Sequence, residues 1–153
     1  MINILVVEDD RLSRVFLAAG LRQLGGFDIT DTDSAEAAWT LWSIDRFDVV
    51  LSDIELPGMD GVALARRIRD DEQQRGAQHP VHLVALTGSL AKPENTDRVE
   101  AVFDVVLHKP IGIESLAMIL NDRVLNNPVF SNTRLSHGAS SGSQDVDPCR
   151  GST

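Results

Sequence analysis

The sequence lacks several features that define other classes of protein. Its single cysteine, Cys149, excludes an internal disulfide, and nothing in the polar segment around it would activate the thiol. No apolar run approaches the roughly 20 residues that a membrane helix needs, and Met1 leads directly into an apolar segment without a basic stretch. We therefore expect a cytoplasmic protein that is neither secreted nor inserted into a membrane.

Positive charge is also scarce. The formal net charge is −9, and residues 1–124 carry 21 acidic side chains against 12 lysines and arginines, whereas residues 125–153 carry two of each kind. A nucleic-acid interface needs basic residues gathered on one face to replace phosphate counterions. The only local gathering of arginines, at residues 66–69, is followed at once by three acids. We expect no direct contact with nucleic acid.

The length and composition suit one folded domain. The chain has 153 residues, of which 42% are hydrophobic and 24% are charged, as is ordinary for a globular protein with a single core. Apolar residues become rare towards the end of the chain, where Ser, Asn, Gly and Asp predominate. Such a segment buries too little surface to offset its ordering entropy. We expect a domain over residues 1–124 and a disordered polar tail or linker over residues 125–153.

Five short apolar runs alternate with segments whose apolar residues recur at helical spacing. The runs predict strands at residues 2–7, 27–30, 47–53, 81–86 and 105–108, and the other segments predict helices at about residues 12–24, 34–45, 60–72, 93–102 and 115–120. Asp10, Ser34 and Asp60 are placed to cap three of these helices. The alternation predicts an α/β fold in which a doubly wound, five-stranded parallel sheet has helices on both faces.

The second predicted helix contains both tryptophans of the chain. Trp39 lies off the centre of the apolar face that residues 37, 38 and 41 form, and Trp42 lies at its margin. Two interpretations stay open: the indoles close the rim of the core, or they form a surface patch for a partner protein.

Side chains that can carry chemistry stand at the ends of four predicted strands. Glu8 and Asp9 follow the first strand, Asp53 ends the third, Thr87 follows the fourth and Lys109 follows the fifth. The carboxyl ends of parallel strands meet at one edge of a sheet, where open α/β sheets bind their ligands. We therefore expect these side chains to share one pocket.

The three acids in this group suggest a bound cation. Three carboxylates at close range would raise one another's pKa unless a cation lay among them. Carboxylate, carbonyl and water oxygens suit Mg²⁺, which is held by few protein groups. With the metal in place, Asp53 could attack a phosphoryl group while Lys109 and the Thr87 hydroxyl bind the phosphoryl oxygens. We interpret Asp53 as the reactive residue.

This arrangement resembles the receiver domain of bacterial two-component response regulators over residues 2 to about 122. In that family an acidic pair follows the first strand, as Glu8-Asp9 does here, and the phosphoacceptor aspartate ends the third, as Asp53 does in the context Asp-x-x-x-Pro-Gly-Met-Asp-Gly. A Thr or Ser after the fourth strand and a Lys-Pro pair after the fifth correspond to Thr87 and Lys109-Pro110. The resemblance implies a flavodoxin-like sheet with strand order 2-1-3-4-5.

The resemblance also implies ligands and partners. Mg²⁺ would be bound directly by Asp9, Asp53 and the main-chain carbonyl of Glu55, with Glu8 acting through water, and the Lys109–Pro110 bond would be cis. The phosphoryl donor would be a histidine kinase or a histidine phosphotransfer protein, and the signal would pass to a downstream protein effector. The chain would catalyse only its own phosphorylation and dephosphorylation.

A departure from the family pattern bears on how a signal would be transmitted. Val106 stands three residues before Lys109, where receivers usually have a Tyr, Phe or His that changes rotamer together with the Thr. A degenerate receiver, acting as a phosphorylation-independent protein-interaction module, is therefore the alternative. Residues 53–57 fit a phosphatase with an aspartate nucleophile poorly, because the motif of such enzymes is Asp-x-Asp followed by Thr or Val. Residues 57–61 and 85–87 look like the receivers of hybrid histidine kinases.

Overall fold

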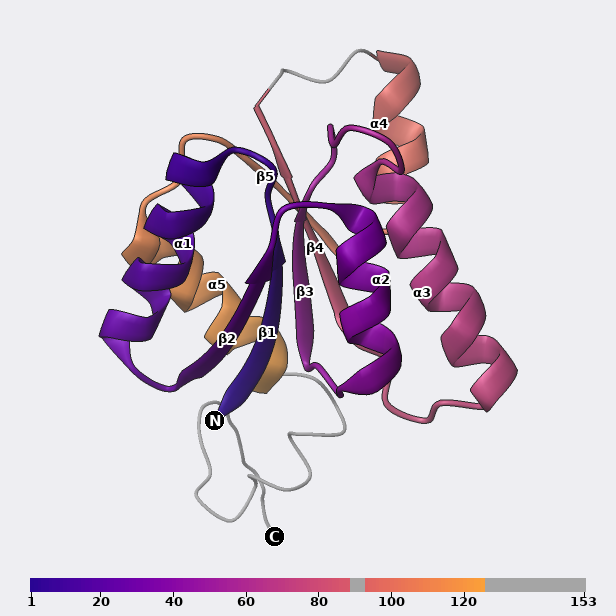
Figure 1. Ribbon diagram of the computed structural model, residues 1–153, viewed down its shortest axis with the longest axis horizontal. Helices are drawn as coiled ribbons and strands as arrows, with labels where there is room; N and C mark the ends of the chain where they lie inside the picture. Colours follow the sequence, from indigo (N-terminus) through magenta and orange to yellow (C-terminus); the bar gives the residue numbers. More distant parts are fainter. Residues whose placement is uncertain (89–92, 126–153) are drawn as a thin grey trace, which may run out of the picture.

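The computed structural model describes residues 1–88 and 93–125, so nearly all of the tail expected at residues 125–153 lies outside the described residues. Strands and helices alternate along the described chain (Figure 1). The elements are β1 (Ile2–Val7), α1 (Arg11–Leu24), β2 (Phe27–Thr32), α2 (Ala35–Ile44), β3 (Val49–Asp53), α3 (Gly61–Arg75), β4 (His82–Thr87), α4 (Pro93–Glu100), β5 (Val105–His108) and α5 (Ile113–Leu125). None of these helices is long and apolar enough to cross a membrane.

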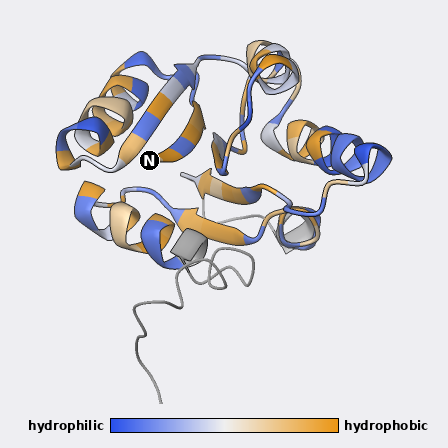
Figure 2. Ribbon diagram, turned by 90° about the horizontal axis from the view of Figure 1, so that it is seen from below, coloured by the Kyte–Doolittle hydropathy of each residue, from blue (hydrophilic) through white to orange (hydrophobic). Residues whose placement is uncertain are grey.

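The strands form one parallel sheet in the order β2-β1-β3-β4-β5. Helices α1 and α5 cover one face of the sheet, and α2, α3 and α4 cover the other (Figure 1). Figure 2 shows hydrophobic residues concentrated along the central strands. This is the doubly wound, flavodoxin-like architecture that the sequence predicts, and the strand order is confirmed.

Each face of the sheet buries its own hydrophobic cluster, because successive residues of a strand point to opposite faces. Beneath α1 and α5 the cluster includes Ile4, Val6, Leu17, Leu21, Leu51 and Leu116. Beneath α2, α3 and α4 it includes Leu5, Val50, Val62, Ile68, Leu83 and Phe103. The central strand β3 is buried along its whole length, which explains why its sequence is an unbroken apolar run up to Ser52.

The register of the strands aligns their carboxyl ends. Val7 of β1 lies opposite Ser52 of β3, and Asp53 lies opposite Leu86, the residue before Thr87 at the end of β4. Strand β5 ends at the same level as β4. The residues that follow these strands therefore meet at one edge of the sheet, the upper edge in Figure 1.

The predicted helix caps are confirmed. The side chains of Asp10, Ser34 and Asp60 each accept a hydrogen bond from the main-chain N–H three residues later, at 2.9, 3.1 and 2.8 Å. Helix α3 ends at Gly76, whose φ of 65° is left-handed and favours glycine. The local sequence thus fixes where α1, α2 and α3 begin.

Some predicted boundaries were wrong by a few residues. Strand β2 runs to Thr32, not residue 30, because it pairs with β1 along the whole length of β1. Helix α3 continues to Arg75, because Glu72 turns into the core and does not mark a polar end of the helix. Helix α5 begins at Ile113, which packs against the cluster beneath α1, two residues before the predicted start. Helix α4 ends at Glu100, before the predicted residue 102.

The two tryptophans occupy different environments. Trp42 is 5% exposed, belongs to the cluster beneath α2, and donates a hydrogen bond from its indole nitrogen to Asp71 at 2.9 Å. Trp39 is half-buried at the edge of that cluster, and the Arg67 guanidinium lies 4.3 Å from the centre of its ring. The interpretation that the indoles close the core is therefore confirmed for Trp42, and Trp39 lies at the rim.

Candidate functional site

The polar residues expected in one pocket lie at the carboxyl edge of the sheet. Glu8 directly follows β1, Asp53 is the last residue of β3 and Thr87 is the last residue of β4. Their exposed fractions are 1%, 8% and 5%, so three polar residues are buried where the strands leave the core. Asp9, by contrast, is exposed at the mouth of this edge. The flanking apolar strands force this burial, because they fix the chain up to the last residue of each strand.

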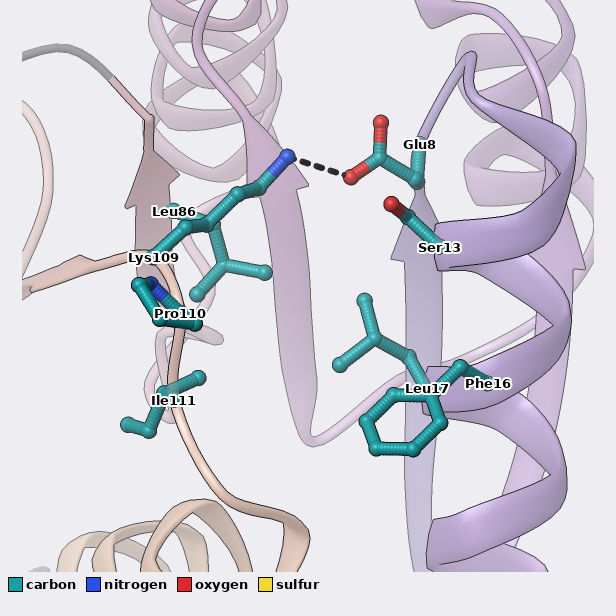
Figure 3. Close-up of a pocket in the computed structure, with 8 residues that line it drawn as sticks. All are labelled: Glu8, Ser13, Phe16, Leu17, Leu86, Lys109, Pro110 and Ile111. Carbon is teal, nitrogen blue, oxygen red and sulfur yellow. Dashed lines mark hydrogen bonds and ion pairs between the residues drawn. The ribbon is translucent and has the colours of Figure 1, made fainter.

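Lys109 joins two of the acids. Its Nζ lies 2.6 Å from Oε1 of Glu8 and 3.2 Å from Oδ2 of Asp53 (Figure 3 shows the contact with Glu8). Burial of the ammonium opposes its charge. The hydrogen bond to Glu8 and the negative charges of Asp53 and Glu8 outweigh that burial, so the pKa of Lys109 is raised. Lys109 is therefore held as a cation between two carboxylates from distant parts of the chain.

Burial has the opposite consequence for Glu8. Removal of its carboxylate from water raises the pKa of Glu8, and the negative charge of Asp53 raises it further. The hydrogen bonds from Lys109 and from the main-chain N–H of Asp10, at 2.6 and 3.2 Å, act against that rise and do not cancel it. Lys109 thus offsets the burial of the Glu8 carboxylate only in part.

Three acids at this edge can hold a cation together. Glu8, Asp9 and Asp53 each offer a carboxylate oxygen, and these oxygens lie within 4.8 Å of one another. The residues fit Mg²⁺, because the donors are hard oxygens and exposed Asp9 leaves one side open to water. These acids supply fewer oxygens than an octahedral shell requires, which suits an ion that keeps several of its waters.

Glu55, whose main-chain carbonyl was the remaining expected metal ligand, lies in the loop that follows β3. Its side chain is exposed. The loop is anchored at its start by a hydrogen bond from Ile54 N–H to Leu86 O at 3.1 Å, and at its end by one from Gly61 N–H to Ile54 O at 2.9 Å. The structure therefore places Glu55 two residues beyond Asp53 on a fixed loop, and its role as a ligand stays a prediction.

Thr87 and Lys109 are linked through the main chain. The Lys109 N–H donates to Thr87 O at 2.8 Å, which extends the β4–β5 ladder by one residue beyond the strands. The Lys109–Pro110 peptide bond is cis, as the resemblance implied. Val106 is half-buried on β5 and packs against the cluster beneath α2, α3 and α4. Thr87 thus lies beside Lys109 at the same edge of the sheet, and its chemical role stays a prediction.

An apolar cavity that was not predicted from the sequence lies beside the acids. A cavity of about 190 Å³ lies between α1 and the segment that follows β5. Glu8 and Lys109 close one end, while Phe16 and Leu17 of α1 face Leu86, Pro110 and Ile111 across it (Figure 3). Phe16 is 59% exposed, although its helical spacing suggested a core residue. Only the tertiary placement of the segment after β5 against α1 reveals this cavity.

Two close contacts at the site were also missed. A Cβ atom on Gly61 would lie 2.2 Å from the main-chain oxygen of Asp53, so α3 begins in direct contact with the end of β3. Glu36 of α2 accepts a hydrogen bond from the main-chain N–H of Met59 at 3.0 Å. The Asp-Gly pair at the start of α3 could have indicated the contact of Gly61 with Asp53. Nothing in the sequence indicates the contact of Glu36 with Met59.

Known proteins match the chain over the part that contains these residues. The family model described as response regulator receiver domain matches residues 4–121. The virulence sensor protein BvgS of Bordetella pertussis is 38% identical over 124 residues, which are 80% of this chain and 10% of that protein. The sensor histidine kinase RcsC of Escherichia coli is 35% identical over 117 residues, 76% of this chain and 12% of that protein. The chain thus spans about a tenth of the length of these curated relatives.

Solved structures match at the level of the whole sheet. The receiver domain of sensor histidine kinase PA1611 from Pseudomonas aeruginosa, which has a magnesium ion coordinated in its active-site cleft, is 30% identical with a TM-score of 0.70, and the match covers 80% of this chain and 96% of that one. The co-crystal structure of the Saccharomyces cerevisiae histidine phosphotransfer protein Ypd1 with the receiver domain of Ssk1 gives 26% identity, a TM-score of 0.72, and coverage of 83% and 94%.

Proposed function

The chain belongs to the family of response regulator receiver domains of two-component signalling, and on that premise we propose that it is a phosphoacceptor switch whose reactive residue is Asp53. The receiver domain would comprise residues 1–124. Its phosphoryl donor would be a histidine kinase or a histidine phosphotransfer protein, and the phosphorylated form would change its binding to a downstream protein effector in the cytoplasm. The magnesium-bound PA1611 receiver and the Ypd1–Ssk1 complex support this assignment by similarity.

The proposed reaction is a direct phosphoryl transfer to a carboxylate. An oxygen of Asp53 attacks phosphorus, the bond between phosphorus and the donor imidazole nitrogen breaks, and that nitrogen keeps the electron pair and takes up a proton. Lys109 and the Thr87 hydroxyl bind phosphoryl oxygens as negative charge develops on them. Mg²⁺, when bound, neutralises the charge of the acids and of the incoming phosphoryl group.

Four residues would hold that ion. Asp9 and Asp53 supply carboxylate oxygens, Glu55 supplies its main-chain carbonyl, and Glu8 acts through a water molecule. Their donor types suit a hard divalent cation. The closeness of the three carboxylates supports the same assignment, because their oxygens lie within 4.8 Å of one another and a cation at this place would relieve their mutual repulsion.

The position of Lys109 is the single observation that carries the proposal. Its ammonium lies within 3.2 Å of the Asp53 carboxylate and 2.6 Å of the Glu8 carboxylate. A lysine at the surface end of a strand has no need to enter an acidic cluster, because water solvates it well. A cation fixed beside the candidate acceptor oxygen is what stabilisation of a transferring phosphoryl group requires.

Labelling by a small phosphodonor tests the proposal. The protein incubated with acetyl phosphate and Mg²⁺ should gain the mass of one phosphoryl group, and chelation of Mg²⁺ should prevent the gain. Asp53→Asn should abolish the labelling, whereas Asp28→Asn, at an exposed position near the opposite edge of the sheet, should leave it unchanged. Labelling of Asp53→Asn to the wild-type level would refute the assignment.

An exposed apolar rim on α1 offers a place for the protein donor to dock. Leu12, Val15 and Phe16 share one face of the helix and are 80%, 52% and 59% exposed. Phe16 lines the cavity that Glu8 and Lys109 close at one end, so this rim lies beside the acidic site that a donor histidine would approach. We expect Phe16→Ala to slow transfer from a phosphohistidine protein about tenfold and to leave acetyl phosphate labelling unchanged. Ile44→Ala, at another apolar residue that is 72% exposed, is the control.

Val106 favours a second candidate function. A half-buried valine has no polar group or ring with which to follow a change at Thr87. A degenerate receiver would bind its partners equally with and without a phosphoryl mimic. Beryllofluoride with Mg²⁺ discriminates between the two functions: a switch changes its affinity for a captured partner when the mimic binds, and an interaction module does not.

A further inference from the structure

A side chain on α2 reaches the loop that follows the candidate phosphoacceptor. We infer that Glu36 is a positioning residue for the metal site: its carboxylate fixes the loop of residues 54–60, and thereby the main-chain carbonyl of Glu55, in the place that a divalent cation needs. This inference rests on the proposed function, because it assigns a supporting residue to the same site. Glu36 itself does not contact the acids.

The contact between Glu36 and the loop is specific. Oε2 of Glu36 accepts a hydrogen bond from the main-chain N–H of Met59 at 3.0 Å, across 23 residues of sequence. Glu36 stands in the first turn of α2, which Ser34 caps, so the base of its side chain is fixed by the helix. A fixed helix therefore presents a carboxylate to a main-chain donor in the middle of the loop.

Gly58 makes room for this carboxylate. Its φ of 77° is left-handed, and a Cβ atom built on it would lie 2.7 Å from Oε2 of Glu36. A residue with a side chain would thus be strained, and the Glu36 carboxylate would have to move aside to admit it. The conformation of the turn and the position of Glu36 are therefore matched to each other.

The rest of the loop shows why a support at its tip matters. Hydrogen bonds of Ile54 and Gly61 fix the two ends, and Leu56 is 8% exposed and packs beneath. In the tip, residues 57–59, Pro57 and Gly58 are exposed, and the half-buried Met59 side chain packs at the edge of the cluster beneath α2, α3 and α4. Glu55 lies between the first anchor and the tip, so loosening of the tip gives its carbonyl freedom that must be lost again when a cation binds.

The Glu36 carboxylate is available as an anion for this role. The N–H of Met59 is the main cause of a lowered pKa at Glu36, and the N–H of Glu36 itself adds to the effect. A charged acceptor makes a stronger hydrogen bond than a neutral one. The link therefore persists at neutral pH, where the switch would operate.

Amide exchange and magnesium binding test the inference together. In Glu36→Ala, hydrogen exchange at the Met59 amide should become at least about tenfold faster. The Kd for Mg²⁺ alone, measured by calorimetry, should rise about three- to tenfold, within the range seen for supporting partners of metal ligands. Glu36→Gln keeps an oxygen acceptor and should recover part of both effects. Glu114→Ala, an exposed acid in the first turn of α5, is the matched control and should change neither quantity.

A double-mutant cycle with Gly58→Ala gives a readout that needs no metal. In the wild-type background Gly58→Ala combines backbone strain with displacement of the Glu36 carboxylate, and in the Glu36→Ala background only the strain remains. We expect the loss in melting temperature on Gly58→Ala to be larger in the first background than in the second, because the Glu36 carboxylate must give up its place near Met59 only in the first.

The possible failures are distinguishable. A wild-type protein that does not bind Mg²⁺ would overturn the proposed metal site itself. Wild-type Mg²⁺ affinity in Glu36→Ala, or unchanged Met59 exchange, would overturn the positioning role while leaving the proposed function intact. Equal losses in both backgrounds of the Gly58→Ala cycle would also count against it, because the two residues would then act independently.

Discussion

Two buried glutamates lie at opposite edges of the same sheet, and their surroundings differ. Glu8 follows β1 at the carboxyl edge and is 1% exposed, whereas Glu72 on α3 lies beside the amino end of β4 and is 6% exposed. Each forms an ion pair: Glu8 with Lys109, which follows β5, and Glu72 with Arg69, one turn earlier in α3. The difference between them lies in the balance of charges and hydrogen bonds around each carboxylate.

At the amino edge the acids are matched by fixed donors. Oε1 of Glu72 accepts from Arg69 at 2.7 Å, and Oε2 accepts from the main-chain N–H of Val81 at 2.6 Å. Oδ2 of Asp104 accepts from Arg69 at 2.8 Å and from Leu83 N–H at 2.8 Å. This cluster ties α3 to the starts of β4 and β5 and leaves its carboxylates satisfied, so it stabilises the fold.

At the carboxyl edge the acids outnumber the cation. Three acids, Glu8, Asp9 and Asp53, lie close together there. The ammonium of Lys109 forms ion pairs with two of them, Glu8 and Asp53. The raised pKa of Glu8 records the remaining repulsion and desolvation. A balanced cluster holds elements together, whereas an unbalanced one is prepared for a ligand that brings the missing charge. Helix α3 joins the two regions, since it begins at Gly61 beside Asp53 and continues past Glu72.

Loss of Arg69 should break the balanced edge and give the largest effect on stability. Arg69→Ala leaves buried Glu72 without its cation, and we expect the free energy of unfolding to fall by about 3 kcal/mol. Arg66→Ala, at an exposed arginine of the same helix, should change it by less than about 0.5 kcal/mol. Urea denaturation measures both. Similar small losses for the two variants would mean that the amino-edge cluster is not structural.

A methyl group at Gly61 should damage the point where α3 meets the acid site. Its Cβ would lie 2.2 Å from the main-chain oxygen of Asp53, so the helix or the end of β3 must shift. We expect Gly61→Ala to cost about 2 kcal/mol of stability and to slow acetyl phosphate labelling severalfold. Gly112→Ala, where a Cβ would meet nothing within 4 Å, is the control. If Gly61→Ala were labelled as fast as the wild type, the reaction at Asp53 would not depend on the contact between α3 and the end of β3.

Removal of the acceptor charge should have a small effect on stability, in contrast to the amino edge. Asp53→Asn loses an attraction to Lys109 and also a repulsion from Glu8. The two changes oppose each other, so the free energy of unfolding should stay within about 1 kcal/mol of the wild-type value, measured without divalent cations. A loss of more than about 2 kcal/mol would place Asp53 with the structural acids.

The pH dependence of stability should show the smallest effect. The pKa of Glu8 is raised above its ordinary value of 4.5, so the folded state binds a proton more tightly than the unfolded state does. The stability that this contributes is complete below about pH 4.5 and is lost as the pH rises through the folded-state pKa. Glu8→Gln should therefore gain stability relative to the wild type between about pH 4.5 and 7, and excess Mg²⁺ should reduce the gain. The pKa of Lys109 is raised from an ordinary value of 10.5, so its titration does not interfere.

The local signals in the sequence predicted most of the framework. Asp10, Ser34 and Asp60 cap the helices that they were expected to cap, because a capping side chain bonds to an amide only three residues away. Apolar runs located every strand for the same local reason. Predicted boundaries were wrong where pairing with a strand distant in the sequence decided them. Strand β2, for example, continues to Thr32 because β1 pairs with it there. Helical spacing likewise did not reveal which residues of α1 face the core, since Phe16 lines the cavity between α1 and the segment after β5 and is exposed.

By itself, the sequence determined which chemical groups end which strands, and parallel pairing was enough to bring those ends to one edge. Only the tertiary structure decided how the charges are shared. Lys109 bridges Glu8 and Asp53, Arg69 satisfies Glu72, and Glu36 supports the loop beyond Asp53. The physical reason is range. Strand and helix formation depend on neighbours in the chain, whereas the state of a buried charge depends on every group within a few ångströms, whatever its place in the sequence.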